Sequence, residues 1–273
     1  HFAGREILGQ MDRRSVKIPV IVFTAFDQFG EGASKKSLAE IERELGSAYP
    51  ALYHGAVSYD AALNDKLKAL WVIGEDMAQT DPNTHHVVAA LEKLELFVVQ
   101  ELFMTETAKL ATVVLPGASF FEKSGTFTNG ERRIQRVNKV VEPIEGTKPD
   151  GQIIVDIMNR MGYPQQDYDP STMLEEISRI VPFFAGVKWE ELGINGKQWP
   201  VKADGSDTEI LHTDSFTRGK GKFQFKDFTE TKELLDHAKD FPYIITTNRE
   251  LEHYNCGAMT RRTKNSEILS EDV

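Results

Sequence analysis

The sequence predicts an α/β fold built on a parallel β-sheet. Three short apolar runs, Leu70–Ile73, Leu96–Val99 and Thr112–Leu115, have the length and β-branched content of buried strands. Apolar residues recur at helical spacing over Val87–Leu94, between the first two runs, and a short helix is expected to begin at Thr105 before the third. Strands that alternate with helices at this spacing form βαβ units, which place their strands parallel in one sheet.

Further elements are expected on both sides of this core. Upstream, Ile18–Ala25 has the pattern of a buried strand, and Ser37 is placed to begin a helix over Leu38–Leu45. The other expected elements are a strand at about Ala56–Tyr59, helices over Asp150–Met161, Ser171–Val181 and about Thr229–Ala238, and a strand at Tyr243–Thr246.

The composition is that of an ordinary globular protein, and it narrows the classes of partner. The 273 residues carry a formal net charge of −10 and are 40% hydrophobic. Binding to nucleic acid depends on clustered Lys and Arg, so this charge argues against it. Cys256 is the only cysteine, which excludes an internal disulfide and a cysteine-ligated zinc or iron–sulfur site within the chain. No apolar run approaches the roughly 20 residues of a membrane span.

Polar residues stand where the expected strands end. Gly74–Asp76 follow the first strand, and Gln100 and Glu101 follow the second. Ligands of open parallel sheets bind at the carboxyl ends of the strands, where an acidic residue commonly accepts hydrogen bonds from ribose hydroxyls. This edge is a candidate nucleotide site; the alternative is that Glu101 and Thr105 only solvate and cap a loop. The GxGxxG and GxxxxGK[ST] motifs are missing from this part of the sequence, which argues against an ordinary NAD-binding or ATP-hydrolysing domain.

Two other segments are dense in polar groups. In Gly125–Gln135, Asn129 offers a donor and an acceptor together, and Arg132 or Arg133 can clamp a phosphate. In the segment from Arg249 to residue 262, a cation, an imidazole and a phenol fall within one loop after a strand, an arrangement that can grip a polar heterocycle. An exposed turn and a solvated surface loop are the alternatives for these two segments.

Seven segments carry a resemblance to one family: Leu70–Asp81, Val98–Ala108, Val113–Gly117, Glu122–Gln135, Asp150–Pro164, Gln198–Pro200 and Thr246–Thr260. They resemble a fragment of the large (alpha) subunit of formate dehydrogenases, which belong to the molybdopterin oxidoreductase family. The resemblance covers about three-quarters of the chain, from Ala61 to Val273. The strand-end motifs are common to the wider family, whereas Gln198–Pro200 and the loop Arg249–Thr260 are similar to formate dehydrogenases more narrowly.

The resemblance implies a fold and a cofactor. Residues 61–240 would form the Rossmann-like, three-layer third domain of these enzymes, and residues 241–273 the truncated start of a double-psi β-barrel that binds the dinucleotide. The implied cofactor is bis(molybdopterin guanine dinucleotide) with molybdenum or tungsten. The implied residues from Gly74 to Thr105 would hold one guanine nucleotide. Glu122, Asn129 and Arg133 would lie close by, and the residues from Arg249 to Thr260 would reach the pterin. The cofactor-binding residues implied in this way are Gly74, Glu75, Asp76, Gln100, Glu101, Thr105, Glu122, Asn129, Arg133, Arg249, His253, Tyr254, Met259 and Thr260.

The chemistry implied by the resemblance is the interconversion of formate and carbon dioxide, with electrons leaving through iron–sulfur clusters. The family's metal-ligating cysteine or selenocysteine, its adjacent histidine and its formate-orienting arginine match no position here, so we assign no catalytic or metal-ligating residue and expect this chain to be inactive alone. The implied partners are the other domains of the subunit, an iron–sulfur electron-transfer subunit and formate, with a 4Fe-4S cluster in the parent enzyme only. A cytoplasmic location is expected, with export of the parent left open. Glu101 and Thr112 stand where the family usually carries Asp.

Residues 1–60 weakly resemble a different family. Gly4–Leu8, Lys17–Ala25 and Gly55–Tyr59 are similar to the second half of a response-regulator receiver domain, with Thr24 at the switch threonine. The phosphoacceptor aspartate and the lysine after the last strand have no counterpart. An insertion within the enzyme family, a gene fusion or an assembly artefact would each account for this segment. Two alternatives to the redox enzyme remain open. One is a cofactor-free scaffold, like the subunit of respiratory Complex I that belongs to the wider family and has lost the cofactor. The other is a signalling module built on residues 1–60.

Overall fold

A computed structural model describes most of the chain, and it divides into two units. The described residues are 20–23, 28–29, 36–50, 53–57, 59–216, 219–221, 223, 225, 227–228, 239–240, 242–243, 251–253 and 256–264. The first unit spans His1–Ser206 and the second Asp207–Val273. The two are described separately below.

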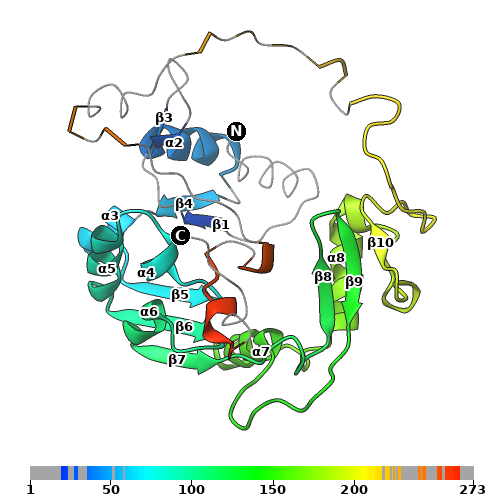
Figure 1. The fold of residues 1–273 in the computed structure, drawn as a ribbon, viewed down its shortest axis with the longest axis horizontal. Helices are drawn as coiled ribbons and strands as arrows, with labels where there is room; N and C mark the ends of the chain where they lie inside the picture. Colours follow the sequence, from blue (N-terminus) through cyan, green and yellow to red (C-terminus); the bar gives the residue numbers. More distant parts are fainter. Residues whose placement is uncertain are drawn as a thin grey trace. The chain divides into compact units, whose positions relative to one another are not determined.

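A three-stranded parallel sheet forms the centre of the first unit (Figure 1). Strands β5 (Ala69–Ile73), β6 (Leu96–Glu101) and β7 (Val113–Pro116) lie in the order β5-β6-β7. In the register, Val72 pairs with Val99 and Gln100 pairs with Leu115. The predicted parallel sheet is therefore confirmed, with β6 in its middle.

Short helices precede and connect these strands and bury their apolar faces in one core. They are α3 (Tyr59–Leu63), α4 (Met77–Thr80), α5 (Thr84–Glu92) and α6 (Glu106–Lys109). Helix α5 contacts α3 and α4, and α6 contacts β6. The helical spacing of α5 places Val87 and Leu91 in the same buried cluster as Phe97 and Val99 of β6. The amphipathic pattern of the sequence and the alternation within β6 thus meet in a single hydrophobic core.

The described part of the first sixty residues contributes two small sheets and helix α2 (Leu38–Ala48). Strand β1 (Val20–Phe23) pairs in parallel with β4 (Tyr53–Val57), and β2 (Gln28–Phe29) pairs with β3 (Lys36–Ser37). Helix α2 (Leu38–Ala48) begins as predicted: the Ser37 hydroxyl accepts from the Glu40 N–H, and the Glu40 carboxylate accepts from the Ser37 N–H, a capping box. Thr24 lies outside the described residues.

The strand expected at Ala56–Tyr59 is placed differently. Strand β4 ends at Val57, and Tyr59 opens helix α3. The Tyr59 side chain is buried in the core around α5, and its hydroxyl donates to Asp81 Oδ2 at 2.5 Å. The sequence pattern missed this because an aromatic residue that follows a β-branched run is equally at home in a strand or in a helix that packs on one.

A second, antiparallel sheet lies further along the chain (Figure 1). Strands β8 (Gly125–Thr128) and β9 (Arg133–Val137) form a hairpin, and β10 (Lys197–Gln198) pairs with β9. The predicted helices are confirmed as α7 (Asp150–Arg160) and α8 (Pro170–Ile180), which are followed by the 3-10 helices η2 (Pro182–Phe184) and η3 (Trp189–Glu191). Their shared core contains Ile134, Leu174, Val187, Leu192 and Val201.

The described part of the second unit contains two 3-10 helices, η4 (Leu251–His253) and η5 (Thr260–Arg262). The helix predicted at Thr229–Ala238 and all but the first residue of the strand predicted at Tyr243–Thr246 fall outside the described residues. The start of a double-psi β-barrel therefore stays a prediction.

Candidate functional site

The three parallel strands end at one edge, and backbone hydrogen bonds tie their ends together. Gly74, directly after β5, donates its N–H to the carbonyl of Gln100 at 2.9 Å, and Gly117, directly after β7, donates to the carbonyl of Glu101 at 3.1 Å. Gly74 has φ +63°, and no atom of the described residues lies within 4 Å of the place where a Cβ would stand. The backbone at Gly74 is thus bare and open, which the close approach of a ligand requires.

Gln100, at the end of the central strand, is the least exposed polar side chain of this edge. It is 1% exposed, and its Nε2 donates to Oδ1 of Asp150 at 2.7 Å. Its Oε1 is also covered, and no donor among the described residues bonds to it. A buried acceptor without a donor is uncommon in folded proteins and is costly to maintain. The amide nitrogen of Gln100 therefore has a hydrogen-bond partner, whereas its oxygen has none among the described residues.

The partner of Gln100, Asp150, reaches the edge from the first turn of α7. Its second carboxylate oxygen pairs with the ammonium of Lys123, which follows β7 in the chain. A Cβ on Gly117 would stand 3.1 Å from Asp150 Oδ1, so the missing side chain gives the carboxylate room. Asp150 and Lys123 are not among the candidate residues that the sequence suggested. An acidic residue at the start of a predicted helix was the one available signal, and helix capping explains it equally well.

Asp76 and Thr105 make hydrogen bonds that organise the loops after β5 and β6. Asp76 Oδ1 accepts from the N–H and the hydroxyl of Thr107, at 3.0 and 2.7 Å. The Thr107 hydroxyl in turn accepts from the Ala78 N–H at 2.9 Å, which joins the two loops. Thr105 caps α6 by accepting from the Ala108 N–H at 3.1 Å. Thr105 therefore caps a helix, which agrees with the alternative given for it, and its predicted role in cofactor binding stays a prediction. Asp76 is buried and joins the two loops.

The two remaining acidic residues of the edge are more exposed. Glu75 accepts from the Thr80 hydroxyl at 2.9 Å, and Glu101 is half-buried and accepts from the Leu102 N–H at 2.7 Å. Thr112, which departs from the family's usual Asp, uses its hydroxyl to accept from the Phe97 N–H at 3.0 Å. That hydroxyl therefore provides a polar contact directly before β7.

Glu122 holds together the long loop between β7 and α7. It is 8% exposed, and its two oxygens accept from the N–H groups of Ser119 and Ile144 at 2.7 and 2.9 Å. Hydrogen bonds from Ser119, and then from the Ile144 amide, hold the pKa of Glu122 below its usual range. The geometry assigns this side chain a loop-fastening role.

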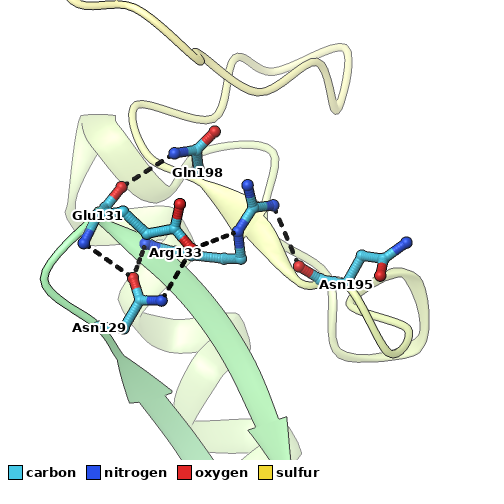
Figure 2. Close-up of polar contacts among 5 residues, drawn as sticks. All are labelled: Asn129, Glu131, Arg133, Asn195 and Gln198. Atoms are coloured by element: carbon cyan, nitrogen blue, oxygen red, sulfur yellow. Dashed lines mark hydrogen bonds and ion pairs between the residues drawn. The ribbon is translucent and has the colours of Figure 1, made fainter.

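Asn129 and Arg133 lie on the hairpin, in a polar network of their own (Figure 2). Asn129 Oδ1 accepts from the N–H groups of Glu131 and Arg133, at 3.1 and 2.9 Å. The Arg133 guanidinium pairs with Glu131 at 3.2 Å and donates to the carbonyl of Asn195 at 3.1 Å. Gln198 of β10 donates to the carbonyl of Glu131 at 3.0 Å. These hydrogen bonds stabilise the β8–β9 turn and join strand β10 to it.

The described part of the loop Arg249–Thr260 shows one contact between candidate residues. His253 is 4% exposed, and its Nδ1 lies 2.9 Å from the hydroxyl of Thr260. Met259 is 46% exposed. Arg249 and Tyr254 lie outside the described residues. The structure thus joins the imidazole to Thr260 within the second unit.

A cavity of about 190 Å³ lies beside the Lys123–Asp150 pair. Its apolar wall includes Phe127 of β8 and Ile177 of α8, and Tyr168 supplies a phenol. Burial, and then the charge of Asp150, raise the pKa of Tyr168. The cavity borders the strand edge through Asp150, but Gly74, Gln100 and Glu101 do not line it.

Comparison with known proteins identifies the family. The model of the molybdopterin oxidoreductase family matches residues 46–160, which include the parallel sheet, its carboxyl edge and α7. The chain is 39% identical over 250 residues to the F420-dependent formate dehydrogenase 2 subunit alpha of Methanococcus maripaludis, covering 88% of this chain and 36% of that one. This chain belongs to the molybdopterin oxidoreductase family. The family match begins at residue 46, upstream of the boundary at Ala61 that the sequence suggested.

Two further comparisons give a second relative and a solved structure. The probable oxidoreductase YjgC of Bacillus subtilis is 43% identical over 202 residues, 73% of this chain and 20% of that one. Acetylene hydratase from Pelobacter acetylenicus superposes with a TM-score of 0.41 at 27% identity, over 51% of this chain and 20% of that one, a likeness too slight to support a statement about the fold. The chain spans about a fifth to about a third of the length of the curated relatives it matches.

Two searches for other features were confined to the described residues. None of their helices has the length and apolar character that crossing a membrane requires. No group of three or more His, Cys, Asp and Glu side chains among them is arranged to hold a metal ion.

Proposed function

We propose that this chain is a cofactor-holding part of a formate dehydrogenase alpha subunit, and that the carboxyl edge of its parallel sheet binds a guanine nucleotide end of bis(molybdopterin guanine dinucleotide). The family match supports a molybdopterin cofactor, and relatives named formate dehydrogenases support formate as the substrate of the whole protein. The guanine dinucleotide form and a molybdenum or tungsten centre belong to the proposal.

One observation carries the assignment of the nucleotide to this edge: the open backbone at Gly74 stands beside the half-satisfied amide of Gln100. Gly74 has a left-handed φ with free space above it, and its N–H is bonded to the carbonyl of Gln100. Gln100 retains a buried oxygen that no donor among the described residues bonds. A polar ligand that passes over a glycine and donates a hydrogen bond fits both features, and open parallel sheets bind ligands at this edge.

The residues of the edge take distinct roles in this proposal. Gly74 lets the backbone approach the nucleotide, Gln100 bonds to it, and the carboxylates of the exposed Glu75 and the half-buried Glu101 accept from ribose hydroxyls. Asp76 and Thr105 order the loops that carry these groups.

The other candidate residues enter the proposal at a greater distance from the nucleotide. Glu122, Asn129 and Arg133 hold the neighbouring loop and hairpin, and the loop Arg249–Thr260 belongs to the pterin side. When bound, this cofactor would supply a two-electron acceptor for the oxidation of formate to carbon dioxide and a proton. The cysteine or selenocysteine ligand and its neighbours would come from other parts of the subunit, so we expect this chain alone to be inactive.

The remaining proposals concern the whole protein. Residues 61–240 would be the family's α/β third domain, and residues 241–273 the start of its double-psi β-barrel. Electrons would leave through a 4Fe-4S cluster to an iron–sulfur partner subunit, and the protein would work in the cytoplasm.

A cofactor-free scaffold is the second candidate. It is favoured by one observation: several of the candidate side chains already bond within the protein. The carboxylate of Asp76, the hydroxyl of Thr105 and the oxygen of Asn129 each accept from backbone N–H groups of the loops that they order. A scaffold needs these bonds and nothing more.

The two candidates differ in what the purified full-length protein contains. We would denature it in acid and measure guanine nucleotide, oxidised pterin and molybdenum or tungsten per mole of protein, and assay dye reduction with formate. Two guanines per metal together with formate-dependent reduction would support the proposed enzyme. Soluble, folded protein without pterin, guanine or metal, isolated from cells that make the cofactor, would favour the scaffold.

A further inference from the structure

We propose that Asp150, held by Lys123, is a positioning residue that turns the amide oxygen of Gln100 toward the bound nucleotide, so that Gln100 recognises a hydrogen-bond donor of the ligand. This inference rests on the proposed function, because a nucleotide at the carboxyl edge is its premise. The donor is a ribose hydroxyl or an N–H of the base. A phosphate oxygen does not fit, since it would meet another acceptor.

The orientation of the Gln100 amide follows from the chemistry of its neighbour. An ionised carboxylate accepts hydrogen bonds and donates none. With Nε2 at 2.7 Å from Asp150 Oδ1, the amide donates to the carboxylate and its oxygen points elsewhere. The flipped amide would place its oxygen against the carboxylate, where two acceptors repel. Asp150 thereby decides which half of Gln100 is left for a ligand.

Three features hold Asp150 in place for this role. Lys123 pairs with the carboxylate oxygen that Gln100 does not use, and it is 23% exposed. Gly117 has no side chain to obstruct the approach of Asp150 to the strand ends. Helix α7 carries Asp150 in its first turn, where a negative charge is favoured by the helix dipole. The three together make this carboxylate a fixed acceptor.

The covered state of the Gln100 oxygen adds a condition. Oε1 is buried, and no donor among the described residues bonds to it. A ligand donor must displace whatever covers this oxygen before it can bond. Binding then supplies a hydrogen bond that no described residue provides, which favours the bound state.

The test uses the full-length protein loaded with its own cofactor, and measures how fast guanine nucleotide is lost during incubation. Gln100→Met removes both halves of the amide at similar volume. Asp150→Asn leaves a single side-chain oxygen as the acceptor for both Lys123 and Gln100. When Lys123 bonds to this oxygen, the NH₂ group of the substituted side chain faces Gln100. The Gln100 oxygen then turns toward this donor and away from the ligand. We expect each variant to lose nucleotide about tenfold faster, the effect of one hydrogen bond.

Two matched controls isolate the position from the chemistry of the change. Asp156→Asn makes the same substitution on the same helix, where Asp156 also pairs with a lysine, Lys148. Gln198→Met replaces another buried glutamine, on the antiparallel sheet. Both controls are expected to lose nucleotide within about twofold of the unmodified protein.

The double variant separates positioning from a general structural role. If Asp150 acts through Gln100, adding Asp150→Asn to Gln100→Met causes no further loss. Equal acceleration by Asp150→Asn in both backgrounds would overturn the positioning role. Nucleotide retention by Asp150→Asn at the unmodified level would overturn it too, even if Gln100→Met failed to fold. Unmodified protein that contains no guanine nucleotide would instead refute the proposed function.

Discussion

The carboxyl edge of the parallel sheet and the β8–β9 hairpin both carry amide and charged side chains, yet these side chains bond differently. On the hairpin, Asn129 accepts from two backbone amides, and the guanidinium of Arg133 has a carboxylate and a carbonyl as partners (Figure 2). At the edge, Gln100 has a partner for its nitrogen but not, among the described residues, for its oxygen. Density of polar residues therefore does not distinguish the two regions, and the proposal for the edge rests on the Gln100 oxygen, which no donor among the described residues bonds.

The two regions also have separate cores, and the largest expected effects come from emptying them. Phe97 in the core of the parallel sheet is 1% exposed, and Ile134 in the core of the hairpin is fully buried. We expect Phe97→Ala to lower the free energy of unfolding by about 3–5 kcal/mol and Ile134→Ala by about 2–5 kcal/mol. Urea denaturation of the full-length protein measures both. Ile194→Ala, at a side chain that is 98% exposed, is the control, with an expected change within about 0.5 kcal/mol.

A glycine in each region gives the next comparison. Neither Gly74 nor Gly130 has an atom of the described residues within 4 Å of its virtual Cβ, but Gly74 alone of the two has a left-handed φ. We expect Gly74→Ala to cost about 1–2 kcal/mol of unfolding free energy and to speed the loss of guanine nucleotide, because the backbone resists a side chain there. Gly130→Ala should change neither quantity measurably. Equal effects of the two substitutions would contradict a special role for the edge.

Asn129→Ala tests the contrast from the side of the hairpin. Two backbone N–H groups lose their acceptor, so we expect a loss of about 1–2 kcal/mol in unfolding free energy. Nucleotide loss at a fixed temperature should stay within about twofold of the unmodified protein, since these bonds serve the turn. A tenfold faster loss would instead make Asn129 a ligand contact.

The smallest expected effect is a pH dependence at the loop between β7 and α7. Hydrogen bonds from Ser119 and Ile144 lower the pKa of Glu122 in the folded chain. A depressed carboxyl pKa contributes stability that is present above the ordinary Glu pKa of about 4.3 and is lost as the pH falls through the folded pKa. Glu122→Gln should therefore flatten the decline in unfolding free energy below about pH 5. Glu176→Gln, at an exposed residue of α8, should leave the decline unchanged.

The elements of the sheet could be predicted because each depends on residues close together in sequence. Apolar runs predicted β5, β6 and β7, and helical spacing predicted α5 and α7. The end of β4 was missed because Tyr59 packs into the core around α5, a contact made across more than twenty residues. The capping box of Ser37 and Glu40 was in part predicted, since both partners lie within one helical turn.

The candidate site divides in the same way. Strand ends are local features of the chain, so the sequence alone was enough to place Gly74, Gln100 and Glu101 at the ends of strands, and their role in binding stays a prediction. The resemblance to formate dehydrogenases also followed from contiguous segments, and the family match confirms the family. Asp150 and Lys123 could not be found from the sequence, because nothing in their own neighbourhoods distinguishes them from a helix-start carboxylate and a surface lysine.

By itself, the sequence determined the parallel sheet, its carboxyl edge, the helices around it and the family, because periodicity and strand-end motifs are properties of short stretches of chain. The tertiary structure alone decided that Gln100 bonds to Asp150, fifty residues away, and that Asn129 and Arg133 are engaged within their own turn. The physical reason is that a hydrogen bond depends on where two groups meet in space. Which polar atom is left without a partner is known only when all of its neighbours are in place.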